Sequence, residues 1–373
     1  MSRQIFTPST EHEEFRTSVR RFAEANATSD ELRALVEEPE GFDRRVWSQM
    51  NEQLGLQGLH VPEEHGGSGV GFAELAIVFE ELGRTLLPSP YLATAALGVS
   101  AILQAATPEQ QARLLPRIAT DAEIVTVAYA EAQDGVDGVA VEAKADGEAH
   151  VLSGHSRHVL DGVAADLLIV PARCDGQLEL FVVEAAAAGL VRTPMAGMDL
   201  TRRQARIDLD GVTAERLGDG DDASDALRTT LDQAAVCLAA EMLGGAQVCL
   251  ETAVQYSKDR YQFGRPIGSF QAVKHRCADM LVDVECARSA VLYAAWAVEE
   301  RPEEAASVAS VAKAFASDAY VRCANNNIYV LGGVGYTWEH DAHLYLRRAT
   351  AAKVLLGEPG RYRTRLSDQL LGA

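Results

Sequence analysis

The chain has 373 residues, of which 47% are apolar, and its 54 acidic and 34 basic side chains give a formal net charge of −20. A chain of this length and composition can bury a large core and divide into two or three packed subregions. The strong negative charge argues against nucleic acid and anionic membrane surfaces as partners, because binding them depends on Lys and Arg side chains that neutralise phosphate. We therefore expect a globular protein with neither kind of partner.

The N-terminal segment and the cysteines indicate in which cellular compartment the protein is expected. The segment Met1–Pro8 lacks an apolar core of signal-peptide length, and no later apolar run reaches the span of a bilayer without a charge. The six cysteines are scattered without a C-x-x-C pair or a His/Cys cluster, so neither a disulfide framework nor a metal site is indicated. We expect a cytoplasmic protein with reduced, mostly buried thiols and no bound metal.

Residues 1–120 have the pattern of an all-α domain. Apolar side chains recur there at helical spacing, and Thr107, Pro108 and Gln110 form a helix start, with an N-cap, a proline at the first position and a glutamine at the third. The segment Val61–Gly69 is too rich in Gly and Pro to be helical, so we predict a loop between two helices.

Residues 121–222 change to a period of two. An Asp146-Gly147 hairpin signal follows the first alternating run, and alternating apolar residues recur later in the block. This pattern predicts a central, antiparallel β domain. The alternating sets are Val141, Ala143 and Ala145, then Leu178, Leu180 and Val182, then Ala205, Ile207 and Leu209.

Residues 223–373 return to helical spacing, so the fold class is mainly α with a central β domain. We expect long helices over residues 225–259, 270–300 and 304–331 and a fourth helix after Thr337, packed as an up-down bundle. The segment Ala234–Leu250 is apolar almost all round, which is typical of a helix buried within a domain or between subunits. We therefore expect an oligomer.

Two short motifs in this last block fit an anionic ligand. Arg260 lies between a long helix and the Phe263-Gly264 break, where a guanidinium can bind a pyrophosphate through two hydrogen bonds. The turn that starts at Gly332-Gly333 lets backbone amides approach a phosphate. Taken singly, an Arg before a turn is usually solvated or caps a helix, and a Gly-rich turn usually only reverses the chain.

In combination, these motifs resemble the flavin-facing signatures of the acyl-CoA dehydrogenase family. The Gly58–Gly67 and Glu80–Gly83 segments match the N-terminal half of the same family, so the resemblance covers nearly the whole chain. It implies an N-terminal α domain, a β-barrel-like middle domain and a C-terminal four-helix bundle. The first signature is Arg260-x-Gln262-Phe263-Gly264-Arg265-Pro266-Ile267-Gly268-x-Phe270-Gln271, and the second is Gly332-Gly333-x-Gly335-Tyr336.

The resemblance also implies FAD as cofactor. In that family FAD lies between the β domain and the bundle of one subunit, and both signatures reach it from the neighbouring subunit. Tyr329 departs from the family, which usually has a Gln at this position. The cofactor-binding residues implied by the match are Arg260, Gln262, Phe263, Phe270, Gln271, Gly332 and Gly333.

The β-domain half of the family's flavin site is altered. A Thr-Glu-Pro loop with a following Ser corresponds here to Ala130-Glu131-Ala132 and Val136, and a Trp-x-Thr strand corresponds to His158-Val159-Leu160. Loss of these partners leaves polar edges of a flavin unpaired, at roughly 1–3 kcal/mol each. Backbone amides are the alternative source of those hydrogen bonds.

The family's usual catalytic glutamate is also replaced. Leu356 occupies that position, and a leucine cannot remove the α-proton of a thioester. Glu358 is nearby but replaces a residue that normally contacts flavin. Some branches of the family place the base on the first bundle helix, at a position that corresponds to Ala234.

Glu241 is the candidate base on that helix. It lies on the apolar stripe seven residues after the Ala234 position, displaced by roughly 10 Å along the helix axis. A carboxylate at such a place is either functional or paired, here with an Arg from another helix or subunit. Both interpretations stay open at this point.

Three functions follow from these patterns. One is a stand-alone, homo-oligomeric acyl-CoA dehydrogenase that uses FAD and Glu241. Another is a partner subunit of a heteromeric acyl-CoA dehydrogenase, similar to the base-lacking subunits of actinobacterial steroid degradation, which completes the FAD site of a second subunit. In both, the substrate is an acyl-CoA, electrons pass to an electron-transfer flavoprotein, and the assembly is a dimer or a tetramer. A flavin monooxygenase or oxidase on the same fold has no positive support in the sequence.

Overall fold

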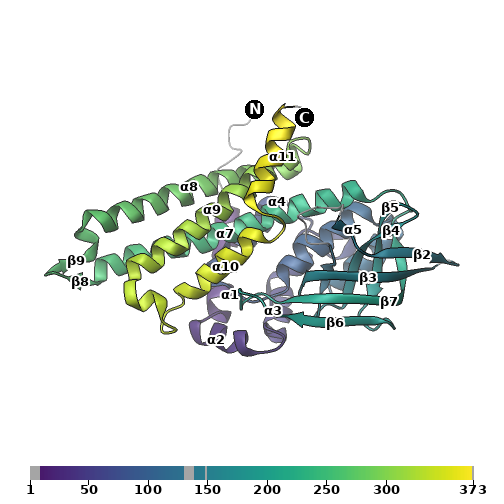
Figure 1. Cartoon of the computed structure of the whole chain (residues 1–373), viewed down its shortest axis with the longest axis horizontal. Coiled ribbons are helices and arrows are strands. Elements are labelled where there is room, and N and C mark those ends of the chain that lie inside the picture. Colours follow the sequence, from purple (N-terminus) through teal and green to yellow (C-terminus); the bar gives the residue numbers. More distant parts are fainter. Residues whose placement is uncertain (1–8, 130–137, 148, 372–373) are drawn as a thin grey trace.

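The computed structural model describes residues 9–129, 138–147 and 149–371. Its helices and strands follow the predicted order of a helical block, a β domain and a helical bundle. Figure 1 shows the long helices of the bundle at one end of the molecule and the strands at the other, with the N-terminal helices packed between them. The predicted fold class, mainly α with a central β domain, is therefore confirmed.

The N-terminal block is helical from residue 10 to residue 119, apart from its connections. The predicted helix start at Thr107 is present as a capping box, in which Thr107 Oγ1 accepts from the Gln110 backbone N–H and Gln110 Oε1 accepts from the Thr107 N–H. The elements are α1 (Thr10–Asn26), α2 (Ser29–Glu37), α3 (Arg44–Leu54), α4 (Phe72–Thr85), a π-helical turn η3 (Leu92–Val99), α5 (Ser100–Ala105) and α6 (Pro108–Ala119).

The Gly-rich segment after α3 is the predicted connection to α4. It contains two short 3-10 turns, η1 (Leu56–Gly58) and η2 (Glu63–His65). A methyl group on Gly67 would lie 2.0 Å from the Val61 carbonyl oxygen, so only glycine fits this close crossing of the backbone.

The middle block closes into a barrel-like sheet. Pairing runs from β4 through β2, β3, β7 and β5 back to β4, while β1 flanks β4 and β6 flanks β7. The hairpin signal is confirmed, since β2 and β3 pair with Asp146 opposite Ala149. The strands are β1 (Val125–Val127), β2 (Glu142–Asp146), β3 (Ala149–Leu160), β4 (Leu167–Cys174), β5 (Gln177–Glu184), β6 (Leu190–Met195) and β7 (Gln204–Leu217).

Two strand predictions need correction. The sheet is not wholly antiparallel, because β1 pairs with β4 in parallel, with Val125 opposite Leu167. Strand β5 is buried on both faces rather than alternating, since it is covered on its outer face as well as inside the barrel. The alternation predicted for Ala205 to Leu209 is present in β7, where every second side chain is buried.

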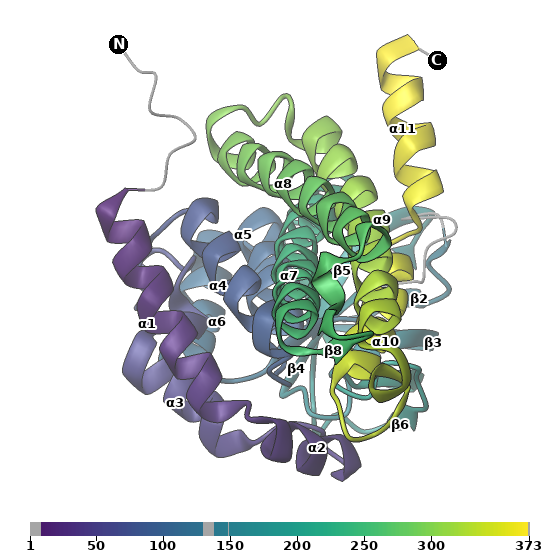
Figure 2. The same cartoon turned by 90° about the vertical axis from the view of Figure 1, so that its left-hand side faces the viewer.

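The bundle helices begin and end within one residue of the predicted positions. The expected fourth helix is divided in two by a turn at Leu355–Glu358, and the second piece, α11, projects from the body in both views (Figures 1 and 2). The elements are α7 (Ser224–Asp259), α8 (Gln271–Glu300), α9 (Ala305–Leu331), α10 (Ala342–Val354) and α11 (Pro359–Leu371), with short strands β8 (Tyr261–Gln262) and β9 (Arg265–Pro266) and the turns η5 (Ile267–Ser269) and η6 (Gly332–Tyr336).

Helix α7 is the central element of the fold. Among the described residues it is the one helix long and apolar enough to cross a bilayer, but 89% of its apolar window is buried inside the protein. It packs against α4, α8, α9 and α10. Its apolar surface is thus accounted for by the core, as the all-round apolar pattern of Ala234–Leu250 predicts.

Helices α4 and α7 cross at backbone contact distance. A methyl group on Gly83 would lie 2.1 Å from the Glu241 carbonyl oxygen, and one on Gly244 would lie 1.9 Å from that of Glu80. The side chains of Glu80 and Glu81 are buried beside this crossing, where Arg16 bridges them at 2.7 and 2.8 Å. The motif Glu80–Gly83 therefore joins the N-terminal block to the bundle.

We predict that Gly244→Ala destabilises the fold by roughly 1–3 kcal/mol, because the added methyl group must push two backbones apart. Chemical unfolding at fixed protein concentration measures the loss. Gly360→Ala is the matched control, since no atom lies within 4 Å of a methyl group placed there. Equal stabilities for the two variants would contradict the close helix crossing.

Candidate functional site

The first bundle-side signature forms an exposed hairpin after α7. Arg260 is the C-cap residue directly after α7, and it is exposed to solvent together with Gln262. Phe263 is 91% exposed and has a φ of +55°, so the hairpin presents this ring outward. Tyr261 in the same hairpin is 61% exposed, so two large side chains of this short segment face solvent.

The rest of the signature packs behind the hairpin. The Phe270 ring contacts Phe263 edge-on, with a centroid distance of 6.0 Å, and the Arg265 guanidinium lies 4.1 Å from the Phe270 centroid. Gln271 is exposed as the first residue of α8. These contacts fix the hairpin's shape while leaving the polar ends of Arg260 and Gln271 open.

The Gly332-Gly333 turn lies at the same end of the bundle as the hairpin, as Figures 1 and 2 both show. A methyl group at either glycine would meet no atom within 4 Å, so the backbone there is open to a ligand. Tyr329, the departure from the family pattern, is 61% exposed, and its ring lies 4.6 Å from the Arg276 guanidinium.

All seven predicted flavin-facing residues of the bundle are thus gathered at one end of the molecule. The chain's own β domain lies at the opposite end in Figure 1. These residues can meet a β domain only in another subunit. Their contact with FAD remains a prediction, but their placement fits a cofactor held across a subunit interface.

The β-domain side fits a flavin poorly at the residues that can be described. Leu160 is fully buried, and its carbonyl oxygen accepts a hydrogen bond of 2.6 Å from Thr126 Oγ1. The side chain therefore fills the core and offers no hydrogen bond. Near it, Nδ1 of His158 lies 3.0 Å from Gln204 Oε1. The loop positions Ala130, Glu131, Ala132 and Val136 lie outside the described residues.

The turn that carries Leu356 is firmly held. Leu356 is 9% exposed with a φ of +61°, and its carbonyl oxygen accepts a 2.7 Å hydrogen bond from the Tyr362 hydroxyl. Glu358, by contrast, is exposed and follows the turn. The position of the family's usual base is therefore occupied by a buried, apolar side chain.

Lys313, which the sequence analysis did not single out, clamps this turn from α9. Its side chain is fully buried, and Nζ donates to the carbonyl oxygens of Lys353 at 2.9 Å and Gly357 at 3.0 Å. Further Nζ contacts reach Ala352 O and Ser317 Oγ. An ammonium at the C-terminal end of a helix satisfies carbonyls that lack partners within the helix. Burial lowers the pKa of Lys313 to about 7.

Glu241 is paired with two arginines. Its Oε2 lies 2.5 Å from Arg202 Nη2 in the loop before β7, and its Oε1 lies 2.7 Å from Arg348 Nη1 on α10. Arg348 also binds Asp199 through Nε at 2.8 Å and Thr201 Oγ1 through Nη2 at 2.6 Å. The pairing that the sequence left open as one alternative is therefore present within a single chain.

This ion network sets the protonation of Glu241. Burial alone raises the pKa of a carboxyl group, but the charges of Arg202 and Arg348 outweigh it and hold the pKa of Glu241 below its usual value. A carboxylate with both oxygens bound to guanidinium groups is a weak proton acceptor. The sequence signal for Arg348 was an arginine on the buried side of α10, and Arg202 had no local signal.

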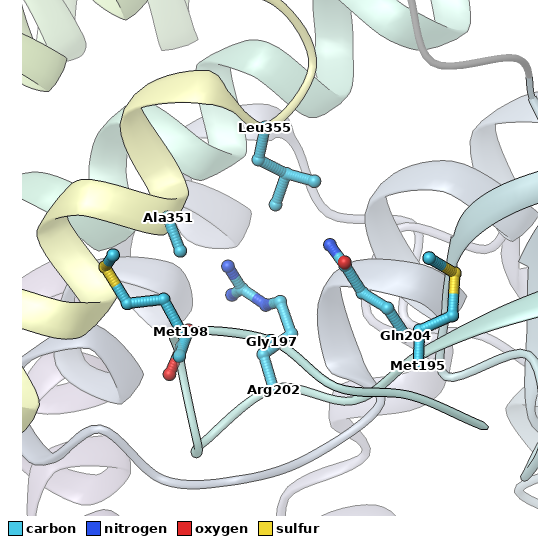
Figure 3. Close-up of a pocket in the computed structure, with 8 residues that line it drawn as sticks. Met195, Gly197, Met198, Arg202, Gln204, Ala351 and Leu355 are labelled. Carbon is cyan, nitrogen blue, oxygen red and sulfur yellow. The ribbon is translucent and has the colours of Figure 1, made fainter.

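A small pocket of about 50 Å³ lies beside this network, between the loop before β7 and the end of α10. Figure 3 shows the Arg202 guanidinium extending into the space below Ala351 and Leu355, with the Gln204 amide at its side. Met195 and Met198 complete the walls. The pocket adjoins the turn of Leu356 through Leu355.

One cluster of possible metal ligands has no signal in the sequence, because His150 lies on a different strand from Cys174 and Glu179. Single ligand atoms of His150, Cys174 and Glu179 lie within 4.8 Å of one another inside the β domain. The Arg216 guanidinium already lies there, with Nε 2.6 Å from Glu179 Oε2 and Nη2 3.0 Å from His150 Nε2. A second cation beside it would be repelled, so this cluster is better described as an arginine site.

The lowered pKa of Lys313 should make the unfolding free energy of the wild type rise with pH. We predict that this rise is lost in Lys313→Met. Between about pH 7 and pH 10 the unfolded chain binds one more proton at this side chain than the folded chain does. The wild type therefore gains about 1.4 kcal/mol per pH unit relative to the variant. Unfolding free energies at pH 7, 8 and 9 test this, with the half-exposed Lys353→Met as control. Parallel pH profiles of wild type and Lys313→Met would show the prediction to be wrong.

Comparison with known proteins agrees with this architecture. Residues 9–122 match the acyl-CoA dehydrogenase N-terminal domain, and residues 224–371 match the acyl-CoA dehydrogenase C-terminal domain. Acyl-CoA dehydrogenase IpdE2 of Mycolicibacterium smegmatis is 35% identical over 97% of this chain and 99% of its own length. The IpdE2 protein of Mycobacterium tuberculosis is 36% identical over 98% of both chains.

Two solved structures of multi-subunit relatives are similar over nearly their full length. A chain of the ChsE4-ChsE5 complex from Mycobacterium tuberculosis superposes with a TM-score of 0.89 at 30% identity, covering 99% of each chain. A chain of the Tcur3481-Tcur3483 steroid acyl-CoA dehydrogenase superposes with a TM-score of 0.88 at 32% identity, covering 97% of this chain and 98% of that one. With both family domains matched and relatives above 30% identity along its whole length, the chain belongs to the acyl-CoA dehydrogenase family.

Proposed function

We propose that this chain is a subunit of a heteromeric acyl-CoA dehydrogenase and completes the FAD site of a partner subunit from the same family. The observation that carries the proposal is the contrast between the two halves of the flavin site. Apart from Tyr329, the bundle-side pattern around Arg260 and Gly332 is kept and lies at the surface, whereas Leu160 and Leu356 fill the chain's own half with apolar side chains.

The reaction class follows from the family. When bound, FAD supplies a ring that accepts hydride from the β-carbon of an acyl-CoA while a base removes the α-proton. In this proposal the partner provides the base, and this chain provides Arg260, Gln262, Phe263, Phe270, Gln271, Gly332 and Gly333 at the cofactor. Electrons then pass to an electron-transfer flavoprotein in the cytoplasm.

The relatives support a heteromer and a bulky substrate. ChsE4-ChsE5 is described as a complex, and the Tcur3481-Tcur3483 protein as a steroid acyl-CoA dehydrogenase. For this chain we infer a tetramer that contains two kinds of subunit. A purely structural role, in which the chain completes the partner's FAD site without touching substrate, is a variant of the same proposal.

A stand-alone enzyme that uses Glu241 as base is the second candidate. Its support is the ionised state of this buried carboxylate, which lies on the helix where some family branches place their base. Against it stand the two arginines bound to its oxygens. The two candidates differ in whether this chain alone holds FAD.

We predict that Arg260→Ala lowers the FAD content of the complex with the partner, because a cation at the pyrophosphate is lost. A loss on the order of tenfold in FAD affinity corresponds to one charge-assisted contact. The visible absorbance of the purified complex measures the occupancy. Arg228→Ala, at the other exposed end of α7, is the control and should leave it unchanged. Unchanged occupancy in Arg260→Ala would remove the main support for the proposal.

We also predict that the isolated chain carries little FAD and is inactive on acyl-CoA. Absorbance of bound flavin, and its bleaching by acyl-CoA without oxygen, separate the two candidates. Stoichiometric FAD that bleaches in the chain alone would rule out the partner-subunit proposal. Glu241→Gln then becomes informative, since loss of bleaching with flavin retained identifies Glu241 as the base.

A further inference from the structure

The pocket in Figure 3 contains a hydrogen-bond donor without a partner. The side chain of Arg202 is 9% exposed, and its Nη1 forms no hydrogen bond within the part of the chain that the structure describes. Its Nη2 is already bound to Glu241. A buried guanidinium N–H without an acceptor is costly, so an acceptor is expected at this point.

A second donor group lies beside it. The amide of Gln204 lines the same pocket, and its Oε1 is engaged with His158, which leaves the Nε2 side of the amide toward the space near Leu355 (Figure 3). Two donors that converge on one space are the typical polar anchor of a small-molecule site with otherwise apolar walls.

The walls fit a carbon frame. Met195, Met198, Ala351 and Leu355 supply apolar surface, and the two thioether side chains adapt to irregular shapes. The volume of about 50 Å³ has room for a single oxygen function and the carbon that bears it. It is too small for a whole ring system, so the rest of the ligand extends out of the pocket.

Charge decides which oxygen function fits. The two arginines of the network, Arg202 and Arg348, are already matched by two carboxylates, Glu241 and Asp199. Asp199 also lines the pocket, so an incoming carboxylate would meet a like charge and leave the cluster with excess negative charge. A neutral carbonyl oxygen can accept hydrogen bonds from the free N–H groups without adding charge to the cluster.

We propose that this pocket binds a neutral carbonyl oxygen on an apolar frame, with Arg202 and Gln204 as the donors. Two sources share that chemistry: a keto group on the acyl chain of a CoA thioester, and a ring carbonyl of a flavin. The keto group is favoured because the neighbouring Leu160 and Leu356 side chains offer a flavin no polar partner. The cavity lies within this single chain. The proposal rests on the proposed function only in taking an acyl-CoA as the substrate.

The test compares matched ligands on the full-length chain by calorimetric titration. The probes are hexanoyl-CoA, 5-oxohexanoyl-CoA, glutaryl-CoA and FAD. We expect 5-oxohexanoyl-CoA to bind on the order of tenfold more tightly than hexanoyl-CoA, as one hydrogen bond to a charged donor provides. Glutaryl-CoA should bind more weakly than the keto ligand because of its carboxylate.

Three variants locate the effect. Arg202→Lys keeps the positive charge beside Glu241 but loses the free N–H, and Gln204→Leu removes the second donor without touching the ion network. Both should reduce the preference for the keto ligand to less than about threefold. Arg206→Lys, in the same strand but paired with Asp208 outside the pocket, should retain it. If circular dichroism shows that Arg202→Lys is unfolded, the preference of Gln204→Leu for the keto ligand decides the test.

The outcomes distinguish the two sources of the carbonyl oxygen from each other and from failure of the proposal. A keto preference that both pocket variants abolish assigns the carbonyl to the acyl chain, and FAD affinity that falls in those variants without a keto preference assigns it to a flavin. Tighter binding of glutaryl-CoA, or affinities that neither variant alters, would overturn the proposal. Failure of the proposed heteromeric function would be detected separately, as an unchanged FAD content of the Arg260→Ala complex.

Discussion

The position of the β domain on the bundle depends on the pairing of one buried carboxylate. Glu241 lies at the centre of α7, and a charge so deeply buried is tolerated only when it is bound by opposite charges. Arg202 and Arg348 meet this requirement from the loop before β7 and from α10. The same pairs orient the Arg202 guanidinium so that its remaining N–H faces the small pocket. Removing either arginine would leave an uncompensated charge where three parts of the chain meet.

The two halves of the proposed flavin site differ because they have different places in the fold. The bundle-side hairpin is exposed and adds little to this subunit's own core, so its side chains are available to another molecule. The β-domain side is part of the core, and Leu160 and Leu356 stabilise it by burial. Membership of the family follows from sequence matches along nearly the whole chain, whereas activity has to be argued from the site.

Helical periodicity and glycine positions predicted most of the architecture from sequence. Helix α7 ends five residues before Gly264 and α9 ends directly before Gly332, so these helix ends were accessible to local reasoning. The parallel pairing of β1 was not, because register between distant strands leaves no local signal. The partners of Glu241 were equally hidden, since Arg202 and Arg348 are 39 and 107 residues away in the chain. Sequence could say only that such a carboxylate needs a partner.

The turn after α10 shows how the family's fold can persist without its usual base. Lys313 and Tyr362 hold this turn through the main-chain carbonyl oxygens of Gly357 and Leu356, and neither contact involves the Leu356 side chain. The backbone path is therefore independent of which side chain occupies that position. A leucine there adds buried apolar surface and removes a carboxylate that would otherwise need a partner. A leucine at the position of the family's usual base is thus compatible with the whole scaffold, because the turn is held through its backbone.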